Sequence, residues 1–315
     1  MAEGRMLVTG GGGFIGSNLA RALLAAGHEV RVIDNFATGR RGNLAGVERD
    51  VEVIDADVLD RTALDKAIDG VSVVFHQAAI PSVSRSVADP LRSHEANATG
   101  TLAVLVAARD VGVDRVVYAS SSSVYGGAAA LPVHEDLPTR PISPYAVSKL
   151  AGEAYCRAFT ATFRLSTVSL RYFNVFGPRQ DPTSEYAAVI PRFVTALLAG
   201  TSPVVFGDGE QSRDFTFIDN VVQANVLAAG AGDEASGRAF NIAHGDRRSL
   251  NQLLEALRSI IGSDLQATYE DPRPGDVRHS QADLTAAREV LGYRPGVSFE
   301  EGLRRTVDWL SSANR

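Results

Sequence analysis

The sequence predicts an α/β fold built on a doubly wound parallel sheet, with a smaller α/β lobe beside it. In the first half of the chain, short apolar runs alternate with longer segments of helical periodicity. These runs are almost continuously apolar, which is typical of parallel strands whose two faces are both covered by helices. Right-handed crossovers between such strands build a doubly wound sheet.

The apolar runs of the first half are expected to form strands at residues 5–9, 29–34, 51–55, 71–76, 115–119 and 167–171. The first helix is expected at residues 14–26, with one face made by Ile15, Leu19, Leu23 and Ala26. Later helical patterns occupy residues 187–199, 221–229, 250–261 and 299–310. A short strand is expected at residues 239–242 and a proline-rich turn at residues 271–275.

Composition and charge narrow the range of functions. The chain has 315 residues, of which 45% are hydrophobic and 22% charged, as is ordinary for a soluble globular protein. Its net charge of −6 argues against a nucleic-acid-binding surface. The single cysteine, Cys156, excludes an intramolecular disulfide and is expected to be a small buried side chain. We find no secretory signal, no membrane-spanning run and no metal-ligand spacing, so we expect a cytoplasmic protein without a metal site or membrane partner.

A glycine-rich turn joins the first expected strand to the first expected helix. Gly10 permits the tight turn, Gly13 lets the backbone approach a pyrophosphate, and Gly16 lets helix and strand pack closely. The free N–H groups at the start of the helix then face the anion. The turn therefore predicts a Rossmann-type dinucleotide site.

The cofactor preference depends on Asp34, which ends the second expected strand. Its carboxylate can accept hydrogen bonds from the adenosine ribose hydroxyls and would repel a 2′-phosphate, so the sequence favours NAD⁺ over NADP⁺. Arg40 and Arg41 lie nearby in the sequence and weaken this preference slightly.

Residues 1–173 are therefore expected to form an NAD-binding Rossmann domain, to which residues 214–245 return. After about residue 174 the regular alternation of apolar runs and helical patterns ends, and Gly177-Pro178 marks a loop. Residues 174–213 and 246–315 are expected to form most of the smaller, substrate-binding lobe.

Tyr145 and Lys149 are the candidate proton-handling pair. They lie four residues apart at the start of a helical pattern and so share one face. A free tyrosine has a pKa of about 10 and is a poor base at neutral pH. A neighbouring ammonium and a cationic nicotinamide ring would both lower the pKa of Tyr145 and make it usable as a general base. The serines at residues 120–123 follow an expected strand, where open α/β sheets bind ligands, whereas Tyr125 is expected to serve packing.

These motifs resemble the extended short-chain dehydrogenase/reductase superfamily. The resemblance rests on the Gly-x-x-Gly-x-x-Gly spacing and on the segments at residues 34–39, 57–58, 76–79 and 97–101. It implies that Ser121, Tyr145 and Lys149 are catalytic. It also implies that the NAD-binding residues are Gly10, Gly13, Phe14, Ile15, Gly16, Asp34, Asn35, Thr38, Gly39, Asp57, Val58, Gln77, Ala78, Ala79, Asn97, Ser120, Tyr145, Lys149 and Tyr172.

Within that superfamily, essentially the whole chain is similar to UDP-hexose 4-epimerases, especially the branch that accepts N-acetylhexosamines. The segments that carry this similarity are residues 171–182, 186–193, 207–215 and 273–276. Two of their arginines suit a diphosphate, because the guanidinium fork pairs with phosphate oxygens. The resemblance implies that the substrate-binding residues are Ser82, Ser122, Ser123, Asn174, Ala188, Val189, Arg192, Phe193, Phe206, Arg213, Arg273, Asp276 and Ser280.

The resemblance also implies a mechanism. Tyr145, assisted by Ser121, would take the proton from the sugar O4 while C4 passes a hydride to NAD⁺. The 4-keto sugar would turn over, and the hydride would return to its opposite face. Related 4,6-dehydratases carry Asp-Glu where this chain has Ser122 and Ser123, and related decarboxylases carry a glutamate in the same loop. A non-catalytic NAD(H) sensor is the hypothesis from another class, although such proteins often lose the tyrosine or the lysine.

The choice of sugar depends on Ser280, at the position that gates the sugar pocket in the family. A tyrosine there would crowd out an N-acetyl group, so serine predicts a pocket for UDP-GlcNAc/GalNAc as well as UDP-Glc/Gal. The alternative is a UDP-glucuronate/galacturonate 4-epimerase in which Arg192 pairs with the C6 carboxylate, with Arg85 and Arg179 as weaker candidates. The resemblance further implies a homodimer formed through the helix that holds Tyr145 and its neighbour.

Overall fold

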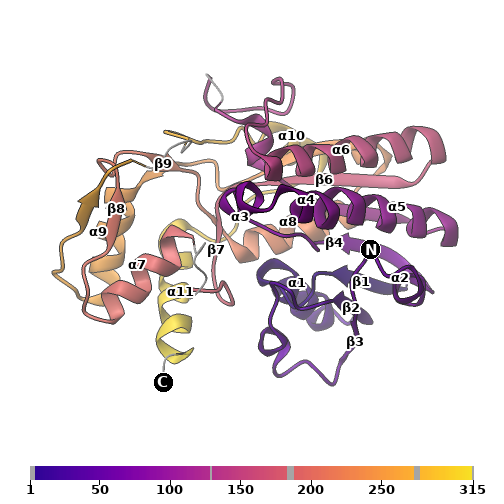
Figure 1. Cartoon of the computed structure of the whole chain (residues 1–315), viewed down its shortest axis with the longest axis horizontal. Coiled ribbons are helices and arrows are strands. Elements are labelled where there is room, and N and C mark those ends of the chain that lie inside the picture. The colour runs from indigo at the N-terminus through magenta and orange to yellow at the C-terminus, as the bar shows by residue number, and fades with distance from the viewer. Residues whose placement is uncertain (1–3, 128–129, 183–187, 273–276, 314–315) are drawn as a thin grey trace.

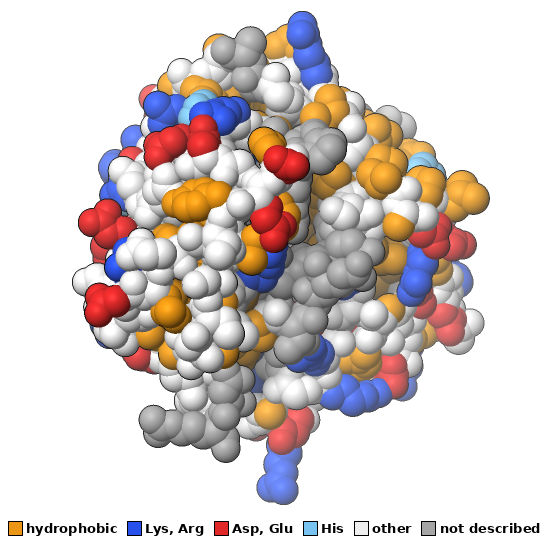
Figure 2. All heavy atoms as spheres, turned by 60° about the vertical axis from the view of Figure 1, so that its left-hand side comes forward, with side chains coloured by type: hydrophobic (Ala, Val, Ile, Leu, Met, Phe, Trp, Pro, Cys, Tyr) orange, Lys and Arg blue, Asp and Glu red, His pale blue; other side chains and the backbone are white. Residues whose placement is uncertain are grey.

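The structure is a computed structural model that describes residues 4–127, 130–182, 188–272 and 277–313. Figure 1 shows a central sheet with helices around it and a smaller lobe at one side, which contains α7, α9 and β8. The face drawn in Figure 2 exposes acidic, basic and hydrophobic side chains together.

Parallel strands form a seven-stranded sheet in the order β11-β6-β5-β4-β1-β2-β3. Their bounds are β1 Arg5–Thr9, β2 Val30–Asp34, β3 Val51–Asp55, β4 Val71–His76, β5 Arg115–Ser121, β6 Ser166–Tyr172 and β11 Arg238–Ile242. The order reverses between β1 and β4, so the sheet is doubly wound and the predicted fold class is confirmed. Thr9 pairs with Ile33 on one side and with His76 on the other, which aligns the carboxyl ends of β1, β2 and β4 at the reversal point.

Helices cover both faces of this sheet. Leu7 packs in one hydrophobic cluster with Leu64, Val104 and Cys156, and its neighbour Val8 packs in a second cluster that includes residues of the opposite helices. The first face is covered by α2 (Arg61–Ile68), α5 (Gly100–Val111) and α6 (Pro144–Phe163), and the second by α1 (Phe14–Ala25) and α8 (Ile218–Gly230). Because both faces are covered, the strands consist mainly of apolar residues, with buried polar residues such as Ser169 and Arg171 in β6.

The remaining elements connect the sheet or build the lobe. Between β4 and α5 lie α3 (Val83–Ala88), α4 (Pro90–His94) and a π-helical turn, Glu95–Thr99, and a 3₁₀ turn, Ser122–Tyr125, follows β5. The lobe contains α7 (Val189–Leu198), α9 (Leu250–Ile261), α11 (Phe299–Ala313), and β8 (Val204–Phe206) paired with β13 (Thr268–Glu270). The helix α10 (Thr285–Val290) lies instead against β11, at the edge of the large sheet. Two further short pairs join β7 (Val175–Phe176) to β10 (Thr216–Phe217) and β9 (Ser212–Arg213) to β12 (Arg248–Ser249).

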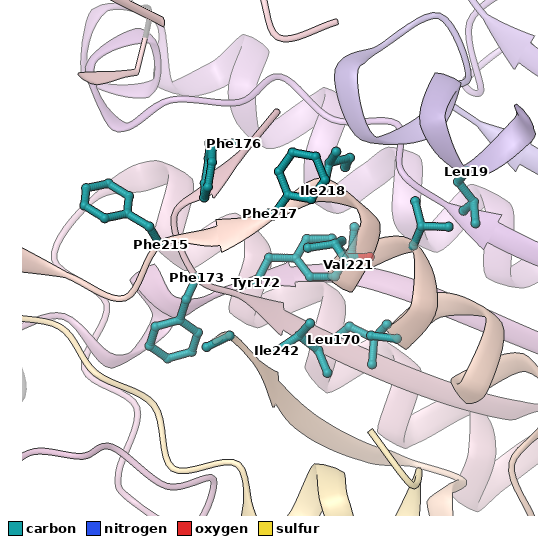
Figure 3. Close-up of a cluster of buried hydrophobic side chains, with 14 of the residues drawn as sticks. Leu19, Leu170, Tyr172, Phe173, Phe176, Phe215, Phe217, Ile218, Val221 and Ile242 are labelled. Carbon is teal, nitrogen blue, oxygen red and sulfur yellow. The ribbon is translucent and has the colours of Figure 1, made fainter. Parts of the chain in front are cut away.

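An aromatic cluster fixes the lobe to the sheet (Figure 3). The Phe176 ring lies edge-on to Phe217, with 5.6 Å between centroids, and to Phe299, with 5.9 Å. Phe215 stacks on Phe299 at 5.7 Å. These rings belong to the same buried cluster as Leu170 of β6, so the core runs from the sheet into the lobe without a break.

The predicted elements differ from the observed ones mainly at their ends. The first helix stops at Ala25, Ala26 is exposed, and Ile15 is only partly buried. Leu19 and Leu23 are buried as expected, but the rest of the buried face consists of the small residues Gly16, Ser17 and Ala20. α8 begins earlier than expected, α11 ends later, and the proline-rich turn at 271–275 lies largely outside the described residues. Cys156 is buried, as expected.

The described ranges contain no helix that is both long and apolar enough to cross a membrane. Across the same ranges, no group of histidine, cysteine and acidic residues could hold a metal ion.

Candidate active site

The glycine-rich turn has the geometry that a dinucleotide needs. Gly10 has a φ of +69°, and a Cβ added there would lie 2.7 Å from the backbone of Ala78. A Cβ at Gly16 would collide with the carbonyl oxygen of Gly10, so the first turn of α1 can approach β1 only without a side chain. The bare backbone of this turn lines a groove of about 530 Å³ at the carboxyl ends of the strands.

The groove brings together all the predicted cofactor residues except Asn97. Gly10, Asp34, Asp57, Gln77, Tyr145 and Lys149 all contribute to its lining. Asn97 lies behind the groove wall and binds the backbone of Ile80. Its Oδ1 accepts a hydrogen bond from Ile80 N at 2.7 Å, and its Nδ2 donates one to Ile80 O at 3.1 Å. Because Ile80 lines the groove, Asn97 shapes the wall through that backbone, and a direct contact of Asn97 with NAD stays a prediction.

Asp34, the predicted ribose contact, lines the groove. It is 8% exposed and accepts hydrogen bonds from Gly12 N at 2.8 Å and Phe36 N at 2.7 Å. Burial raises the pKa of Asp34, while these two N–H groups lower it. The two arginines that weaken the preference for NAD⁺ both have acidic partners: Arg40 pairs with Asp181 at 2.7 Å, and Arg41 pairs with Asp55.

The amino end of α6 positions Tyr145 and Lys149. Ser143 caps the helix by accepting from Ala146 N at 3.2 Å, and the helix starts with a proline, whose missing N–H is not needed there. The ammonium of Lys149 is buried and donates to the carbonyl oxygen of Ala119 at 2.9 Å. It lies 6.0 Å from the centre of the Tyr145 ring.

In the protein without its cofactor, burial dominates the electrostatics of this pair. Burial raises the pKa of Tyr145 above its ordinary value, and a hydrogen bond with Ser121 lowers it only in part. Burial also lowers the pKa of Lys149 to about 8. The neighbouring ammonium therefore does not by itself make Tyr145 acidic, because the cost of a buried phenolate is larger. A further positive charge, such as that of an oxidised nicotinamide, is needed to shift the balance.

A second cavity, of about 610 Å³, adjoins the groove. Both are lined by Ser82, Tyr145 and Tyr172, so the phenol of Tyr145 stands where they meet. The predicted substrate residues that line the second cavity are Ser82, Ser122, Ser123, Asn174, Arg213 and Ser280, together with the predicted catalytic Ser121. The Ser123 hydroxyl oxygen is buried without a hydrogen-bond partner in the described part of the chain, as expected of a group that hydrogen-bonds to a ligand when one is bound.

The far wall of this cavity is held by hydrogen bonds. Asn174 donates through Nδ2 to Ser280 Oγ at 3.2 Å. The Arg213 guanidinium donates to the carbonyl oxygens of Ser212 at 3.0 Å and Arg278 at 3.2 Å. Among the described residues that line the cavity, Arg213 is the only arginine or lysine.

The other predicted substrate residues lie elsewhere. Ala188 lines the cofactor groove, and Phe193 is buried in the core. Arg192 lies on α7 with its guanidinium carbon 5.5 Å from the centre of the Phe206 ring. Val189, Arg192, Phe193 and Phe206 line neither cavity, and Arg273 and Asp276 lie outside the described residues. Their roles in substrate binding stay predictions.

Comparison with known proteins decides the family. Residues 6–243 match the model of the family described as "NAD dependent epimerase/dehydratase family". The chain belongs to this family. The NAD dependence of this family confirms NAD as the cofactor expected from the sequence. The groove described above has the residues to hold NAD.

Relatives cover the whole chain. A UDP-glucose 4-epimerase of Mycolicibacterium smegmatis is 41% identical, over 99% of this chain and 100% of its own length. The solved UDP-N-acetylglucosamine 4-epimerase of Methanobrevibacter ruminantium M1, in complex with UDP-N-acetylmuramic acid, is 40% identical over 99% of this chain and 100% of its own, with a TM-score of 0.95. A UDP-glucuronic acid 4-epimerase of Bacillus cereus, solved with UDP-glucuronic acid and NAD, is 34% identical over 98% and 99%, with a TM-score of 0.91.

This member of the epimerase/dehydratase family has a strap across its cofactor groove that the sequence did not predict. The strap is the loop at residues 178–181, and its Arg179 donates to Asn18 Oδ1 at 2.8 Å. Asn18 in turn donates to the carbonyl oxygen of Pro178 at 3.1 Å. With the ion pair between Arg40 and Asp181, these bonds fasten the lobe to the Rossmann side of the groove. The sequence marks this segment as a loop but does not reveal its partners.

A buried polar network, also missed, supports the serine loop from behind. Glu153 and Arg171 form an ion pair of 2.7 Å, with side chains only 2% and 4% exposed. Ser120 donates to Glu153 Oε1 at 2.5 Å, and Arg171 donates to the Tyr125 hydroxyl at 2.8 Å. Tyr125 therefore packs, as expected, and also carries a hydrogen bond within the core. A charged pair this deeply buried holds its neighbours rigidly, because breaking it would leave an unpaired charge.

Proposed function

We propose that the protein is an NAD-dependent UDP-sugar 4-epimerase that inverts C4 through a transient 4-keto intermediate. The observation that carries the proposal is the position of Tyr145, between a groove lined by a dinucleotide-binding motif and a second cavity lined by serines, Asn174 and Arg213. One phenol can then serve a carbinol in the second cavity while that carbinol faces the nicotinamide end of the groove. Relatives named as UDP-glucose and UDP-N-acetylglucosamine 4-epimerases support the assignment.

The division of the chain follows from the same geometry. We infer that residues 1–173, with residues 214–245, hold NAD, and that residues 174–213 and 246–315 hold most of the nucleotide sugar. The parallel pairing of β11 with β6 supports the return of the second segment to the sheet.

In the proposed mechanism, Tyr145 accepts the proton from the sugar O4, and the hydroxyl of Ser121 stabilises the phenolate through their hydrogen bond. Lys149 places a cation near the ring while it is held by Ala119. Bound NAD⁺ supplies a reversible acceptor for the C4 hydride. Arg213 would hold the diphosphate while the 4-keto sugar turns over in the cavity, and Tyr145 would return the proton to O4.

The cavity favours neutral or N-acetylated hexoses. Ser280 is small and hydrogen-bonded to Asn174, which leaves room for an acyl substituent. The alternative, a uronic acid, requires a cation for its carboxylate. Arg192 lines neither cavity and contacts Phe206, and Arg85 and Arg179 line the cofactor groove, so Arg213 is the one arginine lining the described part of the second cavity.

A side-by-side assay of UDP-GlcNAc, UDP-Glc and UDP-GlcA, with no NAD added, tests both the function and the sugar. We expect turnover of the first two. Turnover of UDP-GlcA alone would overturn the preference for neutral sugars, and full uronate activity in Arg192→Ala would remove that arginine's role. A protein that retained NAD and turned over no UDP-sugar would be the non-catalytic sensor.

We further propose that the protein is a cytoplasmic homodimer. Val111 at the end of α5 and Val147 and Tyr155 on α6 are exposed, although both helices already pack their inner faces on the sheet. Exposed apolar side chains of this kind suit a contact between copies. Sedimentation of the wild type and of Tyr155→Glu tests this: we expect a dimer that the charge weakens, and a wild type that sediments as a monomer contradicts it.

A further inference from the structure

Asp214, between β9 and β10, is a completely buried carboxylate that directly follows Arg213, a residue of the second cavity's lining. It accepts hydrogen bonds from His244 N at 3.0 Å and from Ala282 N at 3.1 Å. Gly245 N donates to both of its oxygens, at 3.1 and 3.2 Å. Every hydrogen bond that the structure gives this carboxylate comes from a backbone N–H group, and the donors lie on two segments far from Asp214 in sequence.

The segment that contains Asp214 and the segment that contains Ala282 both carry residues of the cavity. Asp214 directly follows Arg213, and Ala282 lies two residues after Ser280. The backbone around Asp214 continues the connection, because Ser280 N donates to the carbonyl oxygen of Ser212 at 3.1 Å. Asn174 completes it, with Nδ2 donating to the carbonyl oxygen of Asp214 at 3.4 Å and to Ser280 Oγ at 3.2 Å.

Burying a carboxylate at this position costs free energy, so its presence calls for a physical explanation. Removing it from water disfavours its charged form, and burial raises the pKa of Asp214 to about 7, while the N–H groups of Ala282, Gly245 and His244 lower it. An apolar side chain would fill the space without that cost. Only a group with two acceptor oxygens can satisfy all of these donors at once, because the single oxygen of asparagine would leave an amide facing an N–H group.

We propose that Asp214 is a positioning residue for the nucleotide sugar: it joins the segments that carry Arg213 and Ser280 into one wall, with Asn174 bridging them. The inference rests on the proposed function, since it assigns this wall to the UDP-sugar. It does not make Asp214 a catalytic residue, because its oxygens face backbone N–H groups and not the cavity.

The test compares Asp214→Asn with the matched control Asp246→Asn. Asp246 lies in the same loop as Gly245, but it is exposed and pairs with Arg248 at 2.5 Å. For each protein we would measure the Kd of UDP by calorimetry, the KM and kcat for the UDP-sugar, and the NAD retained on purification. Asp214→Asn is expected to raise both the Kd of UDP and the KM about tenfold, with kcat changed by less than about threefold and NAD retained. Asp246→Asn is expected to match the wild type.

Two outcomes overturn the inference. One is an Asp214→Asn protein with wild-type Kd and KM. The other is a protein whose kcat falls with its folded fraction while KM is unchanged, which is what a purely structural role gives. If Asp214→Asn does not fold, Asp214→Glu keeps the charge and displaces it by one methylene; an unchanged Kd and KM in that variant would also overturn the inference. A wild type that binds UDP but does not epimerise would contradict the proposed function, while the UDP measurements would still decide the role of Asp214.

Discussion

The ammonium nitrogen of Lys149 lies 6.0 Å from the centre of the Tyr145 ring, one helical turn away on α6. Lys149 is held there by the carbonyl oxygen of Ala119, at the end of β5. The distance is short enough for the cation to favour a phenolate, yet burial still raises the pKa of Tyr145 in the protein alone. We therefore expect the charge of the bound cofactor to be needed before Tyr145 can act as a base, and the first two predictions test this expectation.

Replacing Tyr145 by phenylalanine removes the proton acceptor and keeps the ring. We expect kcat to fall by about 10²- to 10⁴-fold, the usual contribution of a general base, with NAD still bound. Steady-state assays and the NAD content of the purified variant check this. A variant that keeps wild-type kcat would rule out Tyr145 as the base.

The pKa of Tyr145 is expected to depend on the redox state of the cofactor. In cofactor-free protein the phenol should titrate above its ordinary value, because burial dominates. Saturating NAD⁺ should lower the pKa, since the charged ring favours the phenolate, and NADH should lower it less. The phenolate absorbance of the wild type minus that of Tyr145→Phe isolates this titration. Equal shifts with NAD⁺ and NADH would show that the nicotinamide charge is not the cause.

The ion pair between Arg40 and Asp181 is expected to slow the release of NAD, because it fastens the strap across the groove. Asp181→Asn should speed release by about fivefold at most, the range of a partly exposed pair. Arg41→Ala is the control, since Arg41 pairs with Asp55 and not with the strap. Stopped-flow displacement of bound NADH measures the rate, and equal rates in the two variants would count against the strap.

Replacing Ser280 with tyrosine should change the preference of the protein between UDP-GlcNAc and UDP-Glc. The larger ring would fill the space beside Asn174, so we expect kcat/KM for UDP-GlcNAc to fall at least about tenfold more than for UDP-Glc. Ser280→Ala removes the hydroxyl without filling the space, and should leave the ratio between the two sugars near that of the wild type. An unchanged ratio in Ser280→Tyr would mean that this position does not face the acyl group.

Sequence patterns predicted the central sheet because its strands have five to seven residues each and are mainly apolar. Residues such as Val73, Val74 and Phe75 mark a strand covered on both faces whatever its partners are. The short pairs of the lobe gave no such signal. β9 and β12 have two residues each and pair antiparallel, a contact between distant segments that local periodicity does not contain.

The candidate site likewise has features that the sequence predicted and features that it did not. The spacing of Gly10, Gly13 and Gly16 fixes a backbone turn, so it locates the cofactor groove from sequence alone. The sequence analysis assigned no role to Asp214, because its proposed role depends on burial and on N–H groups about 30 and 68 residues away. Burial also raises the pKa of Tyr145 in the protein alone, an effect that the neighbouring residues in the sequence could not reveal.

The most direct test of the account follows a deuterium label at C4 of UDP-glucose, with the purified protein and no added NAD. The account predicts UDP-galactose that retains the deuterium at C4, because the hydride leaves and returns to the same carbon through the resident cofactor. Exchange of the label with solvent hydrogen, or the absence of any epimer while NAD is bound, would contradict it.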